Sequence, residues 1–122
     1  MFSHVVVGVN NLDRAKAFYD AVLGALGLEP GVVDRHKVIW RGPTGLFGVT
    51  LPIDGKPATV GNGSTLGFIC ESPEQARAWH AAGVATGGMS IEDPPGWRTE
   101  QLFLAYLRDP DGNKLCAIHR VS

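Results

Sequence analysis

The sequence lacks the features that mark several large classes of protein. Its 122 residues contain no apolar run of 18 or more residues that could span a membrane. The 11 basic and 12 acidic residues are scattered, with no basic stripe that could follow a phosphate backbone. Residues 1–14 carry neither a basic n-region nor a small-residue cleavage site, so no signal peptide is expected. We therefore expect no membrane and no nucleic acid among the partners of this chain.

Cysteine is scarce, and the motifs of several common active sites are missing. Cys70 and Cys116 form neither a CxxC pair nor a disulfide framework, which favours a cytoplasmic protein with reduced thiols. There is no P-loop, no GxGxxG fingerprint and no Ser-His-Asp spacing. Nucleotide binding and nucleophilic hydrolysis therefore have no positive support.

Glycine and proline, by contrast, are abundant. The 16 glycines and 8 prolines predict many turns and hence many short strands. The length of 122 residues allows one domain with a real core and excludes two independent domains. Pro52–Ser64 has no hydrophobic periodicity, and we expect a linker or mobile loop there.

The first half of the chain predicts a strand, a helix and further short strands. Val5, Val7 and Val9 share one face of an expected strand, and Asn11 is a suitable N-cap for a helix that should pack Phe18 and Val22 on that face. The expected strands are Phe2–Val9, Val32–Val33, His36–Arg41 and Leu46–Leu51.

The second half repeats this order. After an apolar run at Thr65–Cys70, Ser72 to Gln75 form a capping box that should open a helix ending at Gly83. The chain then continues through 84–89, an expected loop at 91–101 and a closing hairpin. The halves overlay at an offset of 61 residues, so that Asp13 falls on Glu74. We infer an internal duplication, with modules at residues 1–55 and 63–122 of one domain spanning 1–122.

The hairpin is centred on Asp109-Pro110-Asp111-Gly112-Asn113, between runs at 104–107 and 114–119. Pro110 fixes one backbone angle, and Gly112 can adopt the positive φ of a tight reversal. The bland interpretation of this segment is a well-formed turn.

Two motifs together resemble the vicinal-oxygen-chelate superfamily, which includes glyoxalase I, bleomycin-resistance proteins and extradiol dioxygenases. The first is the opening HVVVGVNNLDRAKAFYDAVLGALGL, and the second is the DPDGNK turn near the C-terminus. The resemblance implies an α+β fold in which two βαβββ modules form a cup from curved sheets. It also implies side-by-side dimers, and a divalent ion (Zn, Ni, Mn or Fe) held by His or Glu from the first and last strands of each module.

The metal ligands that the resemblance implies are incomplete in this sequence. Of the four positions, His4 alone carries a strong donor. Thr65 stands at the equivalent place in the second module, Thr50 or Val49 in the last strand of the first, and Cys116 where metal-using relatives carry Glu. Catalytic zinc keeps about three protein ligands, and hard ions prefer carboxylate oxygen. We therefore expect no complete metal site in the usual place.

Several residues are candidates for lining the cup. Trp97 and Arg98 lie on a proline- and glycine-rich loop of the kind that carries ligand contacts at a cup's mouth, although an Arg on a surface loop is usually only solvated. The candidate ligand-binding set is His4, Trp40, Thr50, Thr65, Trp97, Arg98, Tyr106 and Cys116. Trp40 is equally consistent with the core, and Cys116 with a small buried apolar residue. The catalytic residues stay unassigned.

Two functions follow from different classes. The first is a protein of the bleomycin-resistance type that binds a small organic ligand in the cup without a complete metal site. The alternative is a metal-dependent enzyme acting on vicinal oxygens, either a lactoylglutathione-lyase-like lyase or isomerase, or a dioxygenase. Exposed sheet edges, together with the resemblance, predict a homodimer. The sequence names neither the ligand nor the chain that closes the cup.

Overall fold

The computed structural model describes residues 1–121, over which the chain forms two helices and nine strands. The elements of the N-terminal half are β1 (His4–Gly8), α1 (Leu12–Ala25), β2 (Val32–Asp34), β3 (Lys37–Arg41) and β4 (Leu46–Thr50). Those of the C-terminal half are β5 (Leu66–Ile69), α2 (Pro73–Ala85), β6 (Met89–Ser90), β7 (Gly96–Trp97), β8 (Leu102–Arg108) and β9 (Lys114–Arg120).

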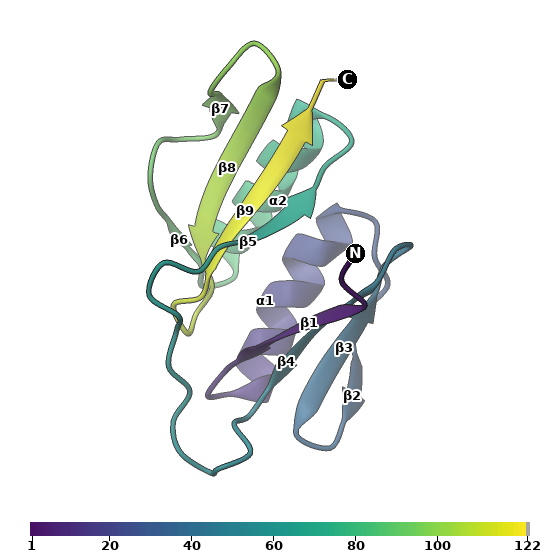
Figure 1. Cartoon of the computed structure of the whole chain (residues 1–122), viewed down its shortest axis with the longest axis vertical. Coiled ribbons are helices and arrows are strands. Elements are labelled where there is room, and N and C mark those ends of the chain that lie inside the picture. Colours follow the sequence, from purple (N-terminus) through teal and green to yellow (C-terminus); the bar gives the residue numbers. More distant parts are fainter. Residues whose placement is uncertain (122) are drawn as a thin grey trace.

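The two halves share one topology. The first sheet has the order β1-β4-β3-β2 and the second β5-β9-β8-β6, with the short β7 added beside β8. In each sheet the first strand lies parallel to the last one, β1 to β4 and β5 to β9, while the other pairs are antiparallel. Figure 1 shows both helices behind the strands, on one side of the molecule. The predicted α+β fold of two βαβββ modules is confirmed.

Both helices begin where local chemistry predicts. The Asn11 side chain accepts a hydrogen bond from the N–H of Arg14, and the Ser72 hydroxyl accepts one from the N–H of Gln75. The Gln75 side chain returns to the N–H of Glu71, the residue before the cap. Each cap satisfies N–H groups that the first helical turn leaves unpaired.

One core spans both modules, because the two helices lie against each other as well as against their sheets. Val9 is fully buried beside Phe18 and Val22, and Val7 packs against the same core. Val5 is only half-buried and stands outside this cluster, because β1 is an edge strand. The aromatic contact between Phe47 and Phe68, with centroids 5.4 Å apart, joins the two sheets.

Most strand ends shift by only one or two residues from the sequence-based expectation, and two differences are larger. Helix α2 continues past Gly83 to Ala85, and Gly83 lies inside the helix, where a Cβ would come within 2.3 Å of Cδ1 of Leu107 in β8. The expected loop at 91–101 contains the strand β7, whose two residues pair with Leu104 and Phe103. Both features depend on contacts with β8, which a local pattern does not contain.

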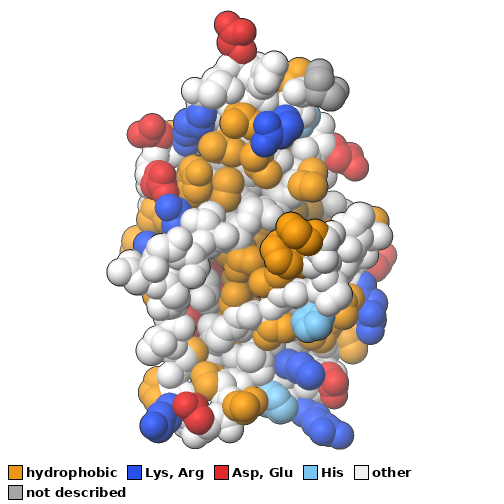
Figure 2. Space-filling model, viewed as in Figure 1, with side chains coloured by type: hydrophobic (Ala, Val, Ile, Leu, Met, Phe, Trp, Pro, Cys, Tyr) orange, Lys and Arg blue, Asp and Glu red, His pale blue; other side chains and the backbone are white. Residues whose placement is uncertain are grey.

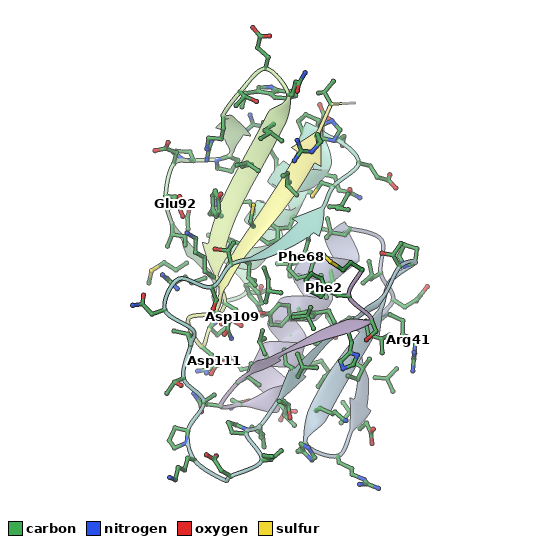
Figure 3. The ribbon with its side chains drawn as sticks, in the orientation of Figure 1. Phe2, Arg41, Phe68, Glu92, Asp109 and Asp111 are labelled. Atoms are coloured by element: carbon green, nitrogen blue, oxygen red, sulfur yellow. The ribbon has the colours of Figure 1, made fainter. Side chains whose placement is uncertain are left out.

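The turn between β8 and β9 joins the two modules (Figure 3). Asp109 is 4% exposed, and its carboxylate accepts a hydrogen bond from the Tyr19 hydroxyl of α1 at 2.5 Å. The Asn113 side chain donates to the carbonyl of Gly8 at 3.0 Å. Asp111 accepts hydrogen bonds from the Asn10 N–H and forms an ion pair with Arg14. The turn motif thus connects β1 and α1 of the first module to the hairpin of the second.

Among residues 1–121, neither helix has the length and apolar character needed to cross a membrane.

Candidate functional site

Each sheet has an open face, defined here as the face turned away from the helices. In Figure 2, hydrophobic side chains gather on this side along the middle of the molecule. Several large apolar residues are exposed there, including Val6 of β1 at 42% and Ile69 of β5 at 84%, with Phe2 at 68% two residues before β1. A surface of this kind in a protein of this size is typical of a binding site or an interface.

The open face of the second sheet brings together an apolar floor and two polar groups. Leu104 stands opposite Ile118 in the β8–β9 register, and Tyr106 stands opposite Cys116. Because side chains alternate along a strand, these four share one face, while Ala105 and Ala117 between them point into the core. The thiol of Cys116 is 6% exposed, whereas Tyr106 is only partly covered.

Three charged side chains, those of Glu92, Lys114 and Arg98, lie near enough to Cys116 to affect its thiol. Lys114 forms an ion pair with Glu92, and its ammonium lies 5.1 Å from the centre of the Tyr106 ring. Arg98 donates to the carbonyls of Asp93 and Gly96, at 2.9 and 3.2 Å. The backbone of Glu92 has a φ of 57°, a left-handed conformation that non-glycine residues adopt at a cost.

Within residues 1–121, Arg98 has no carboxylate partner. Its guanidinium is nevertheless partly buried and lies close enough to Cys116 to lower the pKa of the thiol. A partly buried cation without a counter-charge favours an anionic group of a ligand.

Burial keeps the thiol of Cys116 protonated. Desolvation raises the pKa of Cys116 above its ordinary value, and the Glu92 carboxylate adds to the rise. Hydrogen bonding to Tyr106 and the charges of Lys114 and Arg98 oppose this only in part. Burial, followed by the neighbouring Cys116, raises the pKa of Tyr106 as well. Both groups are therefore neutral near pH 7, and the thiol of Cys116 donates to the carbonyl of Ala117 at 3.5 Å.

The family metal positions do not converge in the first module. His4 pairs with Leu46 and Thr50 pairs with Gly8, four residues further along the same two parallel strands. At about 3.3 Å per residue, the two positions stand about 13 Å apart. Nδ1 of His4 lies 2.7 Å from the Ser3 hydroxyl, and the Thr50 hydroxyl donates to the carbonyl of Leu51 at 2.8 Å.

The residues at these positions do not fit a divalent ion of the family type. Thr65 is exposed directly before β5, and the protonated thiol of Cys116 is a poor ligand because a metal takes the thiolate. Among residues 1–121, no group of three or more His, Cys, Asp and Glu side chains is arranged to hold a metal ion.

The two remaining tryptophan candidates lie on the helix side of the sheets. Trp40 is 1% exposed, and its indole N–H donates to Asp20 of α1 at 2.9 Å, which makes it part of the core. Trp97 is 50% exposed and packs edge-on against Phe103 and His119. The structure therefore places Tyr106 opposite Cys116, with Arg98 near enough for its charge to act on Cys116, and both tryptophans lie on the other side of the sheets.

A cavity of about 210 Å³ opens where the modules meet. Val6 and Gly8 of β1 form one wall, Val60 and Ser64 of the linker a second, and Lys114 of β9 a third. Lys114 thus borders both this cavity and the group around Tyr106 and Cys116.

Sequence reasoning missed Glu92 and Lys114. Strand alternation could have identified Lys114, which shares a face with Cys116 two residues later. Glu92 carries no comparable signal, since its position over the sheet depends on the conformation of the loop after β6.

Comparison with known proteins agrees with this architecture. The family model described as "Glyoxalase/Bleomycin resistance protein/Dioxygenase superfamily" matches residues 1–117. A glyoxalase/bleomycin resistance protein from Albidiferax ferrireducens is 62% identical, with a TM-score of 0.95 and 98% of each chain covered. No curated protein matches the chain.

More distant structures share the fold alone. A lactoylglutathione lyase from Agrobacterium tumefaciens is 21% identical, with a TM-score of 0.70 over 98% of this chain and 92% of that one. A glyoxalase-related enzyme from Fulvimarina pelagi is 16% identical, with a TM-score of 0.77 over 98% and 88%. By its family match and its likeness to the Albidiferax protein, the chain belongs to the glyoxalase/bleomycin resistance protein/dioxygenase superfamily.

Proposed function

We propose that this protein binds a small organic ligand on the open face of its second sheet, without a complete family metal site. The observation that carries the proposal is the partly buried guanidinium of Arg98, which lacks a carboxylate partner within residues 1–121 and is near enough to Cys116 for its charge to act on the thiol. Leu104 and Ile118 supply an apolar floor next to these polar groups. Small-molecule sites combine apolar walls with a few placed polar groups in this way.

The ligand class follows from the charges. Arg98 is free to pair with a carboxylate or phosphate, whereas Lys114 is already neutralised by Glu92. The Tyr106 hydroxyl is protonated and can donate a hydrogen bond, whereas the thiol of Cys116 already donates to the carbonyl of Ala117 at 3.5 Å. We therefore expect an anionic ligand with an apolar body.

Variants at Arg98 test the binding site. A panel of small aromatic and aliphatic acids is screened by thermal shift, and the best acid is titrated by calorimetry against wild type, Arg98→Ala and Arg41→Ala. Loss of a charge-assisted contact of about 1.5–3 kcal/mol predicts binding at least about tenfold weaker in Arg98→Ala. The exposed Arg41 on β3 is the matched control, and Arg41→Ala should bind like wild type. Equal losses in both variants would contradict the assignment.

The alternative is a divalent-metal-dependent enzyme, a lyase or isomerase like lactoylglutathione lyase or a dioxygenase. Family membership supports it, and the chemistry of the four donor positions speaks against it. Elemental analysis of untagged protein, followed by titration with Zn²⁺, Mn²⁺, Ni²⁺ and Fe²⁺, decides between the two. One tightly held ion per site, lost with turnover in His4→Ala, would establish the enzyme.

For a metal-free binder, His4→Ala should have a small effect. We expect well under one equivalent of divalent ion in purified protein, and a change in ligand affinity worth about one hydrogen bond, roughly 0.5–1.5 kcal/mol.

We also propose a homodimer. Each sheet has edge strands, β1 and β2 in the first and β5 and β6 in the second, and the exposed Val6, Ile69 and Phe2 offer an apolar surface that a second copy would cover. Sedimentation velocity at micromolar concentration should give a species of twice 13.0 kDa. A monomer, or a Val6→Asp variant that sediments like the wild type, would count against this interface.

A further inference from the structure

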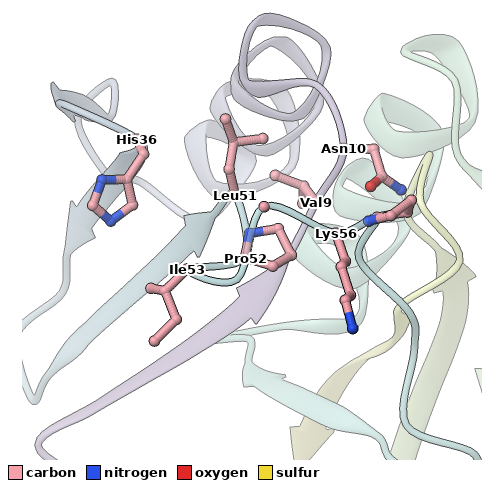
Figure 4. A pocket seen from close by; sticks show the side chains of 9 residues that line it. Val9, Asn10, His36, Leu51, Pro52, Ile53 and Lys56 are labelled. Carbon is pink, nitrogen blue, oxygen red and sulfur yellow. The ribbon is translucent and has the colours of Figure 1, made fainter.

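A second cavity lies at the other end of the first module, away from the group around Arg98. It measures about 580 Å³ and opens at the C-terminal ends of β1 and β4, beneath the first part of the linker. Val9, Leu51 and Pro52 form its apolar base, while His36 and Lys56 stand on different segments of its rim (Figure 4). The volume falls within the range of about 300–1,000 Å³ that holds small ligands in proteins.

The walls of this cavity are formed by hydrogen-bonded segments. The N–H of Leu51 donates to the carbonyl of His36 at 2.9 Å, which ties the β2–β3 turn to the end of β4. The Asn10 side chain accepts from the N–H of Ala58 at 2.7 Å, which ties the linker to the end of β1. Gly55 closes a turn by donating to the carbonyl of Pro52 at 3.2 Å. A ligand would therefore meet a largely preformed site.

The polar side chains on the rim are unused. Within the part of the chain that the structure describes, neither the imidazole of His36 nor the ammonium of Lys56 has a hydrogen-bond or ion-pair partner. Arg35, the residue before His36, has a φ of 58° in a two-residue hairpin loop, where glycine and asparagine are the favoured residues. This costly backbone conformation of Arg35 sets the backbone position of the next residue, His36, in the turn.

Ile53 completes the site. It lines the cavity and is 95% exposed, so a large apolar side chain stands in water beside an apolar base. An apolar body bound against Leu51 and Pro52 would cover it and would gain from the burial.

From these features we propose that the cavity between the β2–β3 turn and the linker binds a small amphipathic anion, with its acidic group between Lys56 and His36 and its apolar body on Leu51, Pro52 and Ile53. The site shares no residue with the ligand site around Arg98. It would serve a second molecule of different shape, because its base is the end of a sheet and not a sheet face.

The test uses two matched probes on the full chain. The anionic probe is 8-anilino-1-naphthalenesulfonate, and the neutral one is N-phenyl-1-naphthylamine, which lacks the sulfonate. Binding is measured by fluorescence titration, and the site is located from the methyl shifts of Leu51 and Ile53 in heteronuclear NMR spectra. The methyl groups of Leu104 and Ile118 report on the other site in the same spectra.

We expect the anionic probe to shift the methyl signals of Leu51 and Ile53. Lys56→Ala should weaken its binding about fivefold or more, the effect of losing one partly exposed charge contact, and should leave the neutral probe unchanged. Lys37→Ala removes the same charge next to His36 without altering a lining residue, and it should change binding by less than about twofold. Ile53→Asp, which adds a negative charge at the rim, should abolish binding of the anionic probe.

Three outcomes would overturn the proposal. One is that the anionic probe shows no saturable binding at concentrations below about 1 mM, because a specific site should bind it more tightly than that. Another is a probe-induced change of methyl shifts confined to Leu104 and Ile118. That result would support the site around Arg98 and would contradict the proposal of a second site. The third is an equal loss in Lys56→Ala and Lys37→Ala, which would mean that only the net charge matters.

Discussion

Asp109→Ala removes the carboxylate that holds the two modules together at the β8–β9 turn and leaves both sheets untouched. The carboxylate accepts hydrogen bonds from the Tyr19 hydroxyl at 2.5 Å, from the N–H groups of Asp111 and Asn113 at 2.9 Å each, and from the Asn113 side chain at 2.9 Å. Each bond to a charged acceptor is worth about 1.5–3 kcal/mol, and a buried donor left unpaired costs about 1–3 kcal/mol. Because such terms overlap, we expect a loss of about 3–5 kcal/mol in the free energy of unfolding.

Urea unfolding followed by tryptophan fluorescence measures this loss. Tyr19→Phe removes one donor from the same carboxylate and should cost about 1–2 kcal/mol, less than the full substitution because Asp109 keeps its other three hydrogen bonds. Asp34→Ala on β2 is the control, since Asp34 is exposed, and it should change stability by less than about 0.5 kcal/mol. If Asp109→Ala cost less than about 1 kcal/mol, or no more than Asp34→Ala, the turn would add little to the core contacts that join the modules.

Two further predictions concern the same core. Burial, and then the Asp109 carboxylate, raise the pKa of Tyr19 well above its ordinary value of about 10. The stability that the neutral phenol contributes is therefore complete below pH 10 and is lost as the pH rises through the folded-state pKa. Urea midpoints above about pH 10 should then fall more steeply with pH for wild type than for Tyr19→Phe. Parallel plots of midpoint against pH for the two proteins would refute this. In Gly83→Ala the new Cβ would lie 2.3 Å from Cδ1 of Leu107, which predicts a loss of about 1–3 kcal/mol by thermal unfolding. Gly24 of α1 is the control, because a Cβ added there meets nothing within 4 Å, and Gly24→Ala should be neutral or stabilising by up to about 1 kcal/mol. Equal losses of stability in Gly83→Ala and Gly24→Ala would exclude the steric cause.

The parts of the fold that depend on neighbouring residues could be predicted from the sequence. Asn11 and Ser72 begin helices because their side chains accept hydrogen bonds from N–H groups three residues later. Both partners of such a bond lie within one short stretch of sequence, so the helix start can be recognised there. The strand β7 could not be predicted in this way. Its two residues, Gly96 and Trp97, are a strand only because β8 offers them hydrogen bonds.

The residues of the candidate site likewise fall into those that the sequence predicted and those whose position depends on distant contacts. Tyr106 and Cys116 were both predicted to line the cup, and the structure shows them opposite each other. Trp40 could not be assigned from its strand alone, because its burial depends on an indole hydrogen bond to Asp20 in a different element. Glu92 lies in an irregular loop and itself adopts a left-handed backbone conformation. No hydrophobic periodicity in the sequence predicts the position of such a residue.

The motif that identifies the family is structural in this chain, and this bears on how its function is inferred. Asp109 accepts a hydrogen bond from Tyr19, and the Asn113 amide donates to Gly8 and Asp109, so both side chains tie the hairpin to the first module. A metal enzyme and a metal-free binder need the same junction between modules, and the motif therefore fits both equally well. What separates the two is the set of side chains on the open face, where this chain has a protonated Cys116 and a guanidinium without a carboxylate partner among residues 1–121. The family match thus explains the scaffold, and the chemistry has to be inferred from the open face.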